Sequence, residues 1–123
     1  MRAYIDTNML LVLASGTRVL DLLAEEYPEY EVCVAQGVIK ELEHLEKTLR
    51  GVNKRAAKLA LDVAAQQHLK VVSHSDSHVD DALLALATSK DVLVTLDKEL
   101  IKRARKQGLR VLTFANKRLR FVA

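Results

Sequence analysis

Short apolar segments alternate with helical segments along the whole of this chain. The runs Val92-Leu93-Val94 and Val111-Leu112 are typical of strands that are buried on both faces. The segment 37–49 is typical of the helices, because apolar side chains recur in it at i, i+4, i+7 and i+11. Alternation of this kind places the strands in a parallel sheet with helices on both faces. The sequence therefore predicts an α/β fold with three layers, α/β/α, around a central parallel sheet.

The expected elements follow from these periodicities and from the turn residues between them. The predicted strands are 2–5, 31–34, 70–74, 91–95 and 110–114, with a last short strand at 119–122. The predicted helices are 17–27, 37–49, 53–69, 79–88 and 98–107. With no repeat or linker in its 123 residues, the chain is expected to form a single domain, 1–123.

The composition argues against a membrane-spanning helix, a secretory signal and a cysteine-based site. No apolar run approaches the roughly 18 residues of a membrane-spanning helix. The first residues, Met1 to Asp6, lack the pattern of a signal peptide. The single cysteine, Cys33, excludes an internal disulfide and a cysteine-based zinc cluster. We therefore expect a cytoplasmic protein with no membrane partner.

Charge is distributed unevenly along the chain, although the net charge is only +3. Residues 98–123 carry nine Lys or Arg and one acid, a net +8, which leaves −5 for residues 1–97. An acidic part that could hold metal is thus followed by a basic part that could hold phosphates, as expected of a nucleic-acid enzyme. The alternative, given equal weight, is a solvated basic helix and tail.

Four acidic residues stand beside apolar sequence at the ends or edges of predicted elements: Asp6, Glu41, Asp81 and Asp97. Asp6 and Asp97 each follow a predicted parallel strand, and ligands bind beyond the carboxyl ends of such strands. Carboxylates that converge repel one another unless a cation or shared protons neutralise them. Hard divalent ions such as Mg²⁺ prefer oxygen ligands. The pattern predicts a site for Mg²⁺ or Mn²⁺ and phosphate chemistry.

Each acid also has a purely structural interpretation. Asp6 and Asp97 could cap the helices that follow them, since Asp is favoured at that position. Ser77-x-x-Asp80 has the form of a capping box, which would assign Asp80 to backbone donors and leave Asp81 for the site. Glu41 flanks an apolar stripe and is expected to lie off the solvated face of its helix.

Histidines offer a different metal site, which the spacing does not favour. His74-x-x-x-His78 would need a helix to bring both rings to one zinc ion, but it spans a predicted strand end and a turn. We expect these two residues to be solvated loop histidines. His44 and His68 lie on amphipathic helices and are expected at the surface.

The order of these motifs resembles the PIN-domain family of nucleases over essentially the whole chain. The matching segments are Asp6-Thr7-Asn8, Glu41 in the helix after the second strand, Asp81-Ala82-Leu83-Leu84-Ala85-Leu86-Ala87 and Val94-Thr95-Leu96-Asp97. The resemblance implies that Asp6, Glu41, Asp81 and Asp97 are the catalytic, metal-binding acids. It also implies that Asn8 and Thr95 orient those carboxylates. The activity it implies is that of an endoribonuclease that uses Mg²⁺ or Mn²⁺ to cleave single-stranded or structured RNA.

Two branches of the family remain open, together with two other classes of function. The basic segment after Asp97 looks like that of stand-alone PIN proteins related to ribosomal-RNA processing nucleases, and its residues Lys102, Arg103, Arg105 and Lys106 are candidates for RNA binding. The toxins of toxin–antitoxin pairs have a similar length and the same acids, and would imply an antitoxin partner. A homodimer is compatible with either branch. The other classes are a non-catalytic RNA-binding scaffold and a Mg²⁺-dependent small-molecule phosphatase, which leaves the basic segment unexplained.

Overall fold

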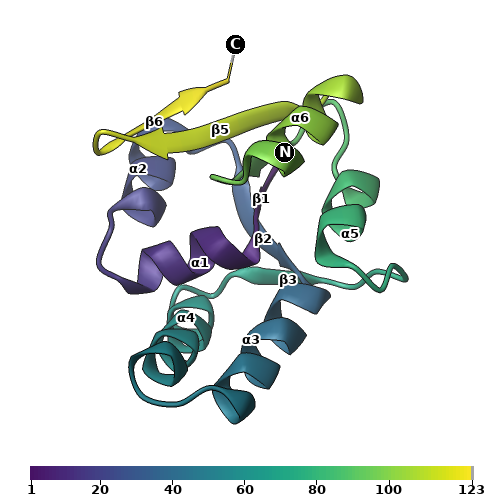
Figure 1. Ribbon diagram of the computed structural model, residues 1–123. Coiled ribbons are helices and arrows are strands. Elements are labelled where there is room, and N and C mark those ends of the chain that lie inside the picture. The colour runs from purple at the N-terminus through teal and green to yellow at the C-terminus, as the bar shows by residue number, and fades with distance from the viewer. Residues whose placement is uncertain (123) are drawn as a thin grey trace.

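The computed structural model describes residues 1–122, which form one six-stranded sheet flanked by helices (Figure 1). The elements in chain order are β1 (Arg2–Ile5), α1 (Thr7–Ala14), α2 (Val19–Glu26), β2 (Glu31–Ala35), α3 (Gln36–Thr48), α4 (Val52–Gln66), β3 (Lys70–Val72), α5 (Val79–Leu86), β4 (Val92–Val94), α6 (Lys98–Lys106), β5 (Arg110–Ala115) and β6 (Arg118–Phe121). The predicted three-layer α/β/α fold is confirmed. One strand departs from the parallel arrangement, because β6 runs antiparallel to β5.

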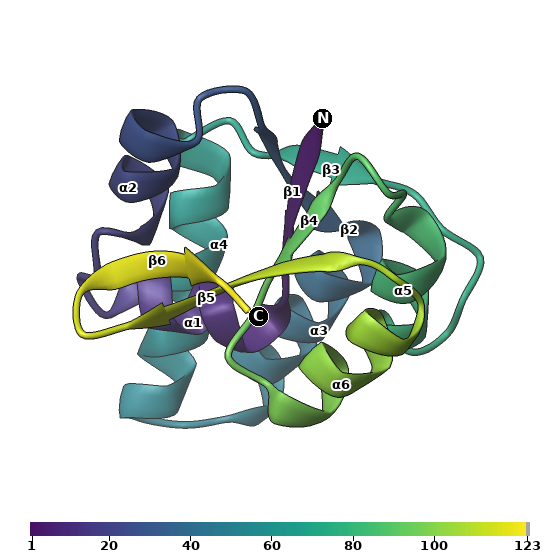
Figure 2. The ribbon, with the colours of Figure 1, turned by 90° about the horizontal axis from the view of Figure 1, so that it is seen from above.

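The strand order is β3-β2-β1-β4-β5-β6, which places β1 and β4 side by side at the centre. From β1 the chain moves outward through β2 to β3, and then returns through α5 to β4 on the other side of β1. The helices α1, α2 and α4 lie on one side of the sheet, and α5 and α6 lie on the other (Figure 2). The direction of the sheet order therefore reverses between β1 and β4, where α/β folds form a ligand crevice.

The centre of the sheet forms the core because its strands carry apolar residues on both faces. Ala3, Tyr4 and Ile5 of β1 are at most 1% exposed, and all of β4 is buried. Helices α3 and α4 pack against each other, and α4 also packs against α1. Within residues 1–122 no single helix is long and apolar enough to span a membrane. Helices α1 and α2 together have the length and composition of a span, but they are bent by 104° at the break between them.

Helix α1 is the element that the periodicity did not predict. Its segment Met9-Leu10-Leu11-Val12-Leu13 is continuously apolar, so it shows no 3.6-residue pattern, and several of its side chains are fully buried. The other differences are at element ends. The helix predicted over 53–69 ends at Gln66, and His68 has a left-handed φ of 53°.

The last predicted strand is the second strand of a hairpin, from Arg118 to Phe121. The two residues at its tip, Asn116 and Lys117, have φ values of 52° and 62°. Two left-handed residues in succession form the tight turn that suits the twist of paired strands. This hairpin is why β6 is antiparallel at the edge of the sheet.

Candidate active site

Asp6 follows β1 directly and is buried at the carboxyl edge of the sheet, with 5% of its surface exposed. Its Oδ1 accepts a hydrogen bond from the backbone N–H of Met9 at 2.8 Å, which caps α1. Its Oδ2 accepts one from the hydroxyl of Thr95 at 2.5 Å. The capping interpretation of Asp6 is therefore correct, and the same carboxylate also lines a pocket between the sheet and the surrounding helices.

Thr95 connects Asp6 to Asp97, the acid that follows β4. Its buried hydroxyl donates to Asp6 and accepts from the backbone N–H of Asp97 at 3.0 Å. The Oδ1 of Asp97 in turn caps α6, accepting from the N–H groups of Glu99 at 2.9 Å and Leu100 at 3.3 Å. A single threonine thus fixes the relative position of two acids that are far apart in the sequence.

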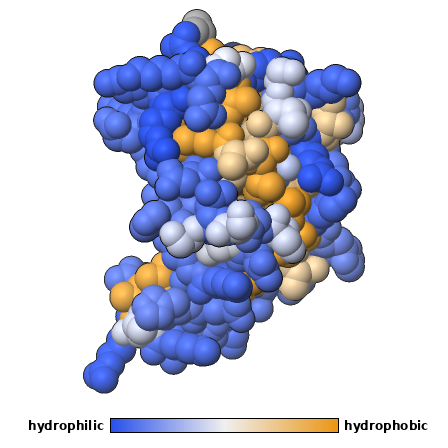
Figure 3. All heavy atoms as spheres, turned by 90° about the vertical axis from the view of Figure 1, so that its right-hand side faces the viewer, coloured by the Kyte–Doolittle hydropathy of each residue, from blue (hydrophilic) through white to orange (hydrophobic). Residues whose placement is uncertain are grey.

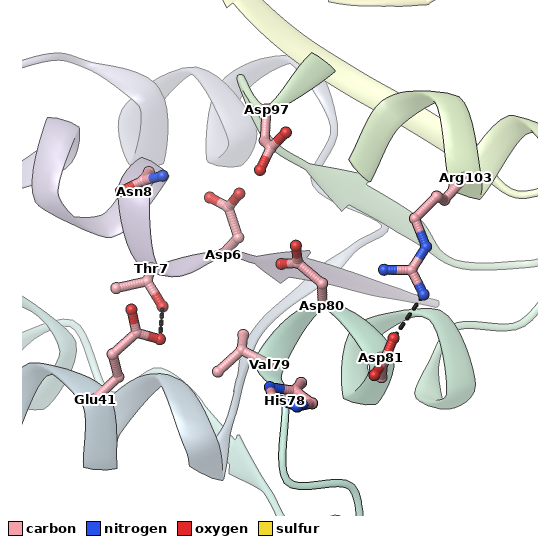
Figure 4. Close-up of a pocket in the computed structure, with 10 residues that line it drawn as sticks. All are labelled: Asp6, Thr7, Asn8, Glu41, His78, Val79, Asp80, Asp81, Asp97 and Arg103. Carbon is pink, nitrogen blue, oxygen red and sulfur yellow. Dashed lines mark hydrogen bonds and ion pairs between the residues drawn. The ribbon is translucent and has the colours of Figure 1, made fainter. Parts of the chain in front are cut away.

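Asp80 and Asp81 are adjacent in the first turn of α5 but point to different neighbours. Figure 4 shows the Asp80 carboxylate directed toward Asp6 and Asp97, whereas Asp81 turns toward α6. There Asp81 Oδ1 accepts a hydrogen bond from Arg103 Nη2 at 2.5 Å. The structure therefore brings Asp80, and not Asp81, to face the two acids at the strand ends.

The predicted capping box at Ser77 and Asp80 is wrong. The helix begins one residue later than the box requires, with His78 at the N-cap and no side chain capping it. Asp80 is therefore free of the backbone role that its spacing indicated. Two adjacent acids in a first helical turn look alike in sequence, and Asp81 is distinguished from Asp80 by Arg103, 22 residues further on.

The acids influence one another electrostatically. Burial is the main reason that the pKa of Asp6 is raised, the charges of Asp80 and Asp97 raise it further, and its two hydrogen bonds partly offset both effects. Burial and then the charge of Asp97 also raise the pKa of Asp80. The hydrogen bond from Arg103 lowers the pKa of Asp81. Asp6, Asp80 and Asp97 therefore form a repelling cluster, while Asp81 is neutralised by its own partner.

Glu41 and Asn8 lie at the rim of the same pocket. Glu41 is exposed, contrary to the expectation from its apolar neighbours, and its Oε2 accepts a hydrogen bond from the Thr7 hydroxyl at 3.1 Å. Asn8 is also exposed, and its side chain has no hydrogen bond to a carboxylate within residues 1–122. The orienting role of Asn8 stays a prediction.

The pocket as a whole is strongly acidic, with five carboxylates and Arg103 among its lining residues (Figure 4). Its donors are hard oxygens, which match Mg²⁺ or Mn²⁺ in chemical type. In their present positions, no three Asp, Glu, His or Cys side chains of residues 1–122 are close enough to hold one ion together. Asp6, Asp80 and Asp97 nevertheless line one pocket and point toward one another (Figure 4), so their oxygens fit a divalent ion in chemical type.

The predicted RNA-binding residues on α6 separate into two groups. Arg103 enters the acidic pocket through its pairing with Asp81. Lys102, Arg105 and Lys106 line a shallow hollow on the outer side of the helix. The side of the molecule that carries α5 and α6 shows hydrophilic side chains on both sides of a band of apolar ones (Figure 3). All four basic residues are exposed, as binding to a polyanion requires.

His74 is half-buried rather than solvated. Its Nε2 accepts a hydrogen bond from the backbone N–H of Gly37 at 2.8 Å, so the ring proton is on Nδ1, which donates to the carbonyl of Asp76 at 2.9 Å. Both ring nitrogens are thus occupied by protein groups. In this arrangement neither ring nitrogen of His74 is free to bind a metal ion.

Comparison with known proteins agrees with this architecture. The sequence pattern of the family described as "PIN like domain" matches residues 3–117, nearly the whole chain. The chain belongs to this PIN-like domain family. It is also 33% identical over 110 residues to the protein named Ribonuclease VapC9 of Archaeoglobus fulgidus, an alignment that covers 89% of this chain and 79% of that protein. The predicted family resemblance is confirmed.

Solved structures with the same fold include two that align over almost all of this PIN-like chain. The PIN domain endonuclease Utp24 superposes with a TM-score of 0.75 at 24% identity, covering 98% of this chain and 90% of that one. A domain of a functionally unknown protein from Methanocaldococcus jannaschii superposes with a TM-score of 0.56 at 17% identity, covering 99% and 98%. At these identities the superpositions show a shared fold.

Proposed function

We propose that this PIN-like protein is a divalent-metal-dependent endoribonuclease that hydrolyses phosphodiester bonds of single-stranded RNA. The observation that carries the proposal is the convergence of Asp6, Asp80 and Asp97 at the point where the sheet order reverses, with Arg103 beside them. Placing the buried Asp6 beside two further carboxylates is costly unless a cation compensates them. The naming of a 33% identical relative as a ribonuclease supports the same conclusion.

Asp6, Asp80 and Asp97 would hold the Mg²⁺ or Mn²⁺, with Glu41 at the rim bound directly or through water. Such an ion lowers the pKa of a bound water and neutralises charge on the phosphate. The sequence placed Asp81 in this set, but its pairing with Arg103 favours Asp80 for that role.

The remaining residues of the site position the acids and the substrate. Thr95 fixes Asp6 and the backbone of Asp97 relative to each other, so the two carboxylates keep their separation. Asp81 holds the Arg103 guanidinium at the edge of the acidic pocket, where its other N–H groups can donate to a phosphate oxygen. The exposed cations of α6 contact the RNA backbone and provide affinity with little sequence discrimination.

The cellular role that we propose is ribosomal-RNA processing in the cytoplasm, because the basic segment after Asp97 suits a long RNA substrate. A toxin of a toxin–antitoxin pair is the alternative, and it requires an antitoxin partner. Co-purification with the product of a small neighbouring gene, with loss of cleavage in that complex, would favour the toxin. Cleavage of one defined site in precursor ribosomal RNA would favour processing.

The activity is tested by offering the protein a single-stranded RNA and a small phosphate monoester, each with Mn²⁺ and with a chelator. The proposal expects internal cleavage of RNA that depends on Mn²⁺, and no cleavage of RNA by Asp6→Asn. Turnover of the monoester alone would identify a phosphatase. RNA binding without cleavage in the presence of any divalent metal would identify a scaffold. Cleavage of RNA in the presence of the chelator would overturn the metal mechanism.

A further inference from the structure

A second pocket adjoins the acidic one, between the start of α3 and the loop that precedes α5. Glu41, His78 and Val79 line both pockets, so the two hollows are adjacent. Resting on the function proposed above, we propose that this second pocket binds the RNA nucleotide next to the scissile phosphate, with Lys40 on its phosphate group. The proposal extends the site beyond the acids to a place where the strand itself is held.

The wall of the second pocket is fixed by close packing around His74. The hydrogen bonds of its ring join the first turn of α3 to the loop before α5. A Cβ added to Gly37 would lie 2.9 Å from His74 Nε2 and 3.2 Å from Val79 Cγ2, so a glycine is needed for this approach. The hollow is therefore bounded by two segments held together at a defined spacing.

The second pocket is less acidic than the first, so it repels an RNA strand less. The acidic pocket has five carboxylates against Arg103. The second pocket has one lysine, Lys40, against Glu41 and Asp76, and three histidines that contribute hydrogen-bonding groups. Lys40 is exposed and forms no ion pair with an acid of residues 1–122, so its charge is available. His44 lies four residues further along α3, on the same face as Lys40.

The position and chemistry of this pocket suit a nucleotide in particular. Figure 4 places Glu41 and Arg103 at opposite edges of the acidic pocket, so a strand that crosses the acids would meet Arg103 on one side and the second pocket on the other. The lining includes the carboxamide of Gln36, the hydroxyls of Ser75 and Ser77 and the imidazole of His44. Such groups hydrogen-bond to ribose hydroxyls and base edges, and imidazole stacks on bases.

The test compares a Lys40→Ala/His44→Ala double variant with Lys54→Ala, which removes an exposed lysine of α4 outside the pocket. Affinity for a single-stranded RNA of about ten nucleotides is measured in chelator over a range of salt, and turnover is measured with Mn²⁺. A small aryl phosphodiester, which cannot reach the second pocket, serves as the second substrate. The double variant should lose about three- to tenfold in affinity, and its slope of log K against log salt should fall by about 0.7 per lost contact.

The small diester should be hydrolysed at the wild-type rate, and kcat for RNA at saturation should be unchanged. Affinity and salt slope equal to those of Lys54→Ala would overturn the second pocket while leaving the nuclease intact. A lower rate on the small diester would also overturn it, because the residues would then affect the chemistry or the fold. Wild-type protein that binds RNA in chelator but never cleaves it would refute the proposed function instead.

Discussion

Exchanging each of the adjacent acids of α5 for asparagine separates their roles. Asp80→Asn removes a carboxylate that faces Asp6 and Asp97, so we expect turnover of RNA with Mn²⁺ to fall at least about 100-fold. Asp81→Asn removes the partner of Arg103 and leaves the three converging acids in place. It should keep kcat within about threefold and raise the KM for RNA about three- to tenfold, because the guanidinium is no longer held at the pocket edge.

Stability should also distinguish the two variants when no metal is present. Asp80→Asn relieves repulsion between like charges and should stabilise the protein. Because the group is partly exposed, screening limits the gain in unfolding free energy to roughly 0.5 kcal/mol, which raises Tm by about 2 °C. Asp81→Asn breaks an exposed pair whose side chains are 48% and 44% exposed, so Tm should change by no more than about 1 °C.

The assays are steady-state cleavage of a labelled RNA and thermal unfolding in chelator, with wild type as reference. Full activity in Asp80→Asn together with an inactive Asp81→Asn would refute this reasoning and restore the assignment that the sequence alone favoured. A destabilised Asp80→Asn in chelator would show that Asp80 has a structural role in place of electrostatic strain.

Three further predictions follow from the same geometry. The pKa values of Asp6 and Asp80 are raised in the folded protein, so the metal-free protein should lose stability relative to Asp80→Asn as pH rises from near 3.8, the ordinary pKa of an aspartate, through the raised values. Urea unfolding between pH 4 and about 7 would show this loss, and a stability difference that widens toward acid would contradict it. Thr95→Val should lower the free energy of unfolding by about 1–3 kcal/mol at neutral pH and reduce cleavage, because it removes the hydroxyl. Thr95→Ser keeps the hydroxyl and should match wild type in both stability and cleavage. Equal stability of the two variants would contradict the role of that hydroxyl. A Lys102→Ala/Lys106→Ala variant should bind RNA more weakly, its slope of log K against log salt should fall by about 0.7 per lost contact, and its kcat should be unchanged. An unaltered slope would show that this face of α6 is solvated and does not contact RNA.

Much of the fold could be predicted because its signals are local. The apolar runs of β1, β4 and β5 and the heptad-like stripe of α3 are visible in short windows of sequence. Helix α1 could not be found in this way, because a continuously apolar segment gives the same pattern for a buried helix and a buried strand. The direction of β6 depended on a two-residue turn without glycine at Asn116 and Lys117, which is not the usual hairpin signal.

The site was predictable where an acid ends a strand and less so where it begins a helix. Asp6 and Asp97 follow β1 and β4, so parallel topology alone brings their backbones to one edge. Within α5, adjacent residues point about 100° apart around the helix axis, and which one faces the cleft depends on where the helix is capped and on Arg103. Those contacts are long-range, as is the hydrogen bond between Gly37 and His74 that builds the second pocket.

The central claim is that Asp6, Asp80 and Asp97 bind a divalent ion, and a crystal soaked in Mn²⁺ tests it most directly. We expect an anomalous-scattering peak among these three carboxylates, within about 2.5 Å of at least two of them, and its loss in Asp80→Asn crystals. A peak coordinated by Asp81 in place of Asp80, or no peak in a protein that still cleaves RNA under the same conditions, would refute binding of the ion by Asp6, Asp80 and Asp97.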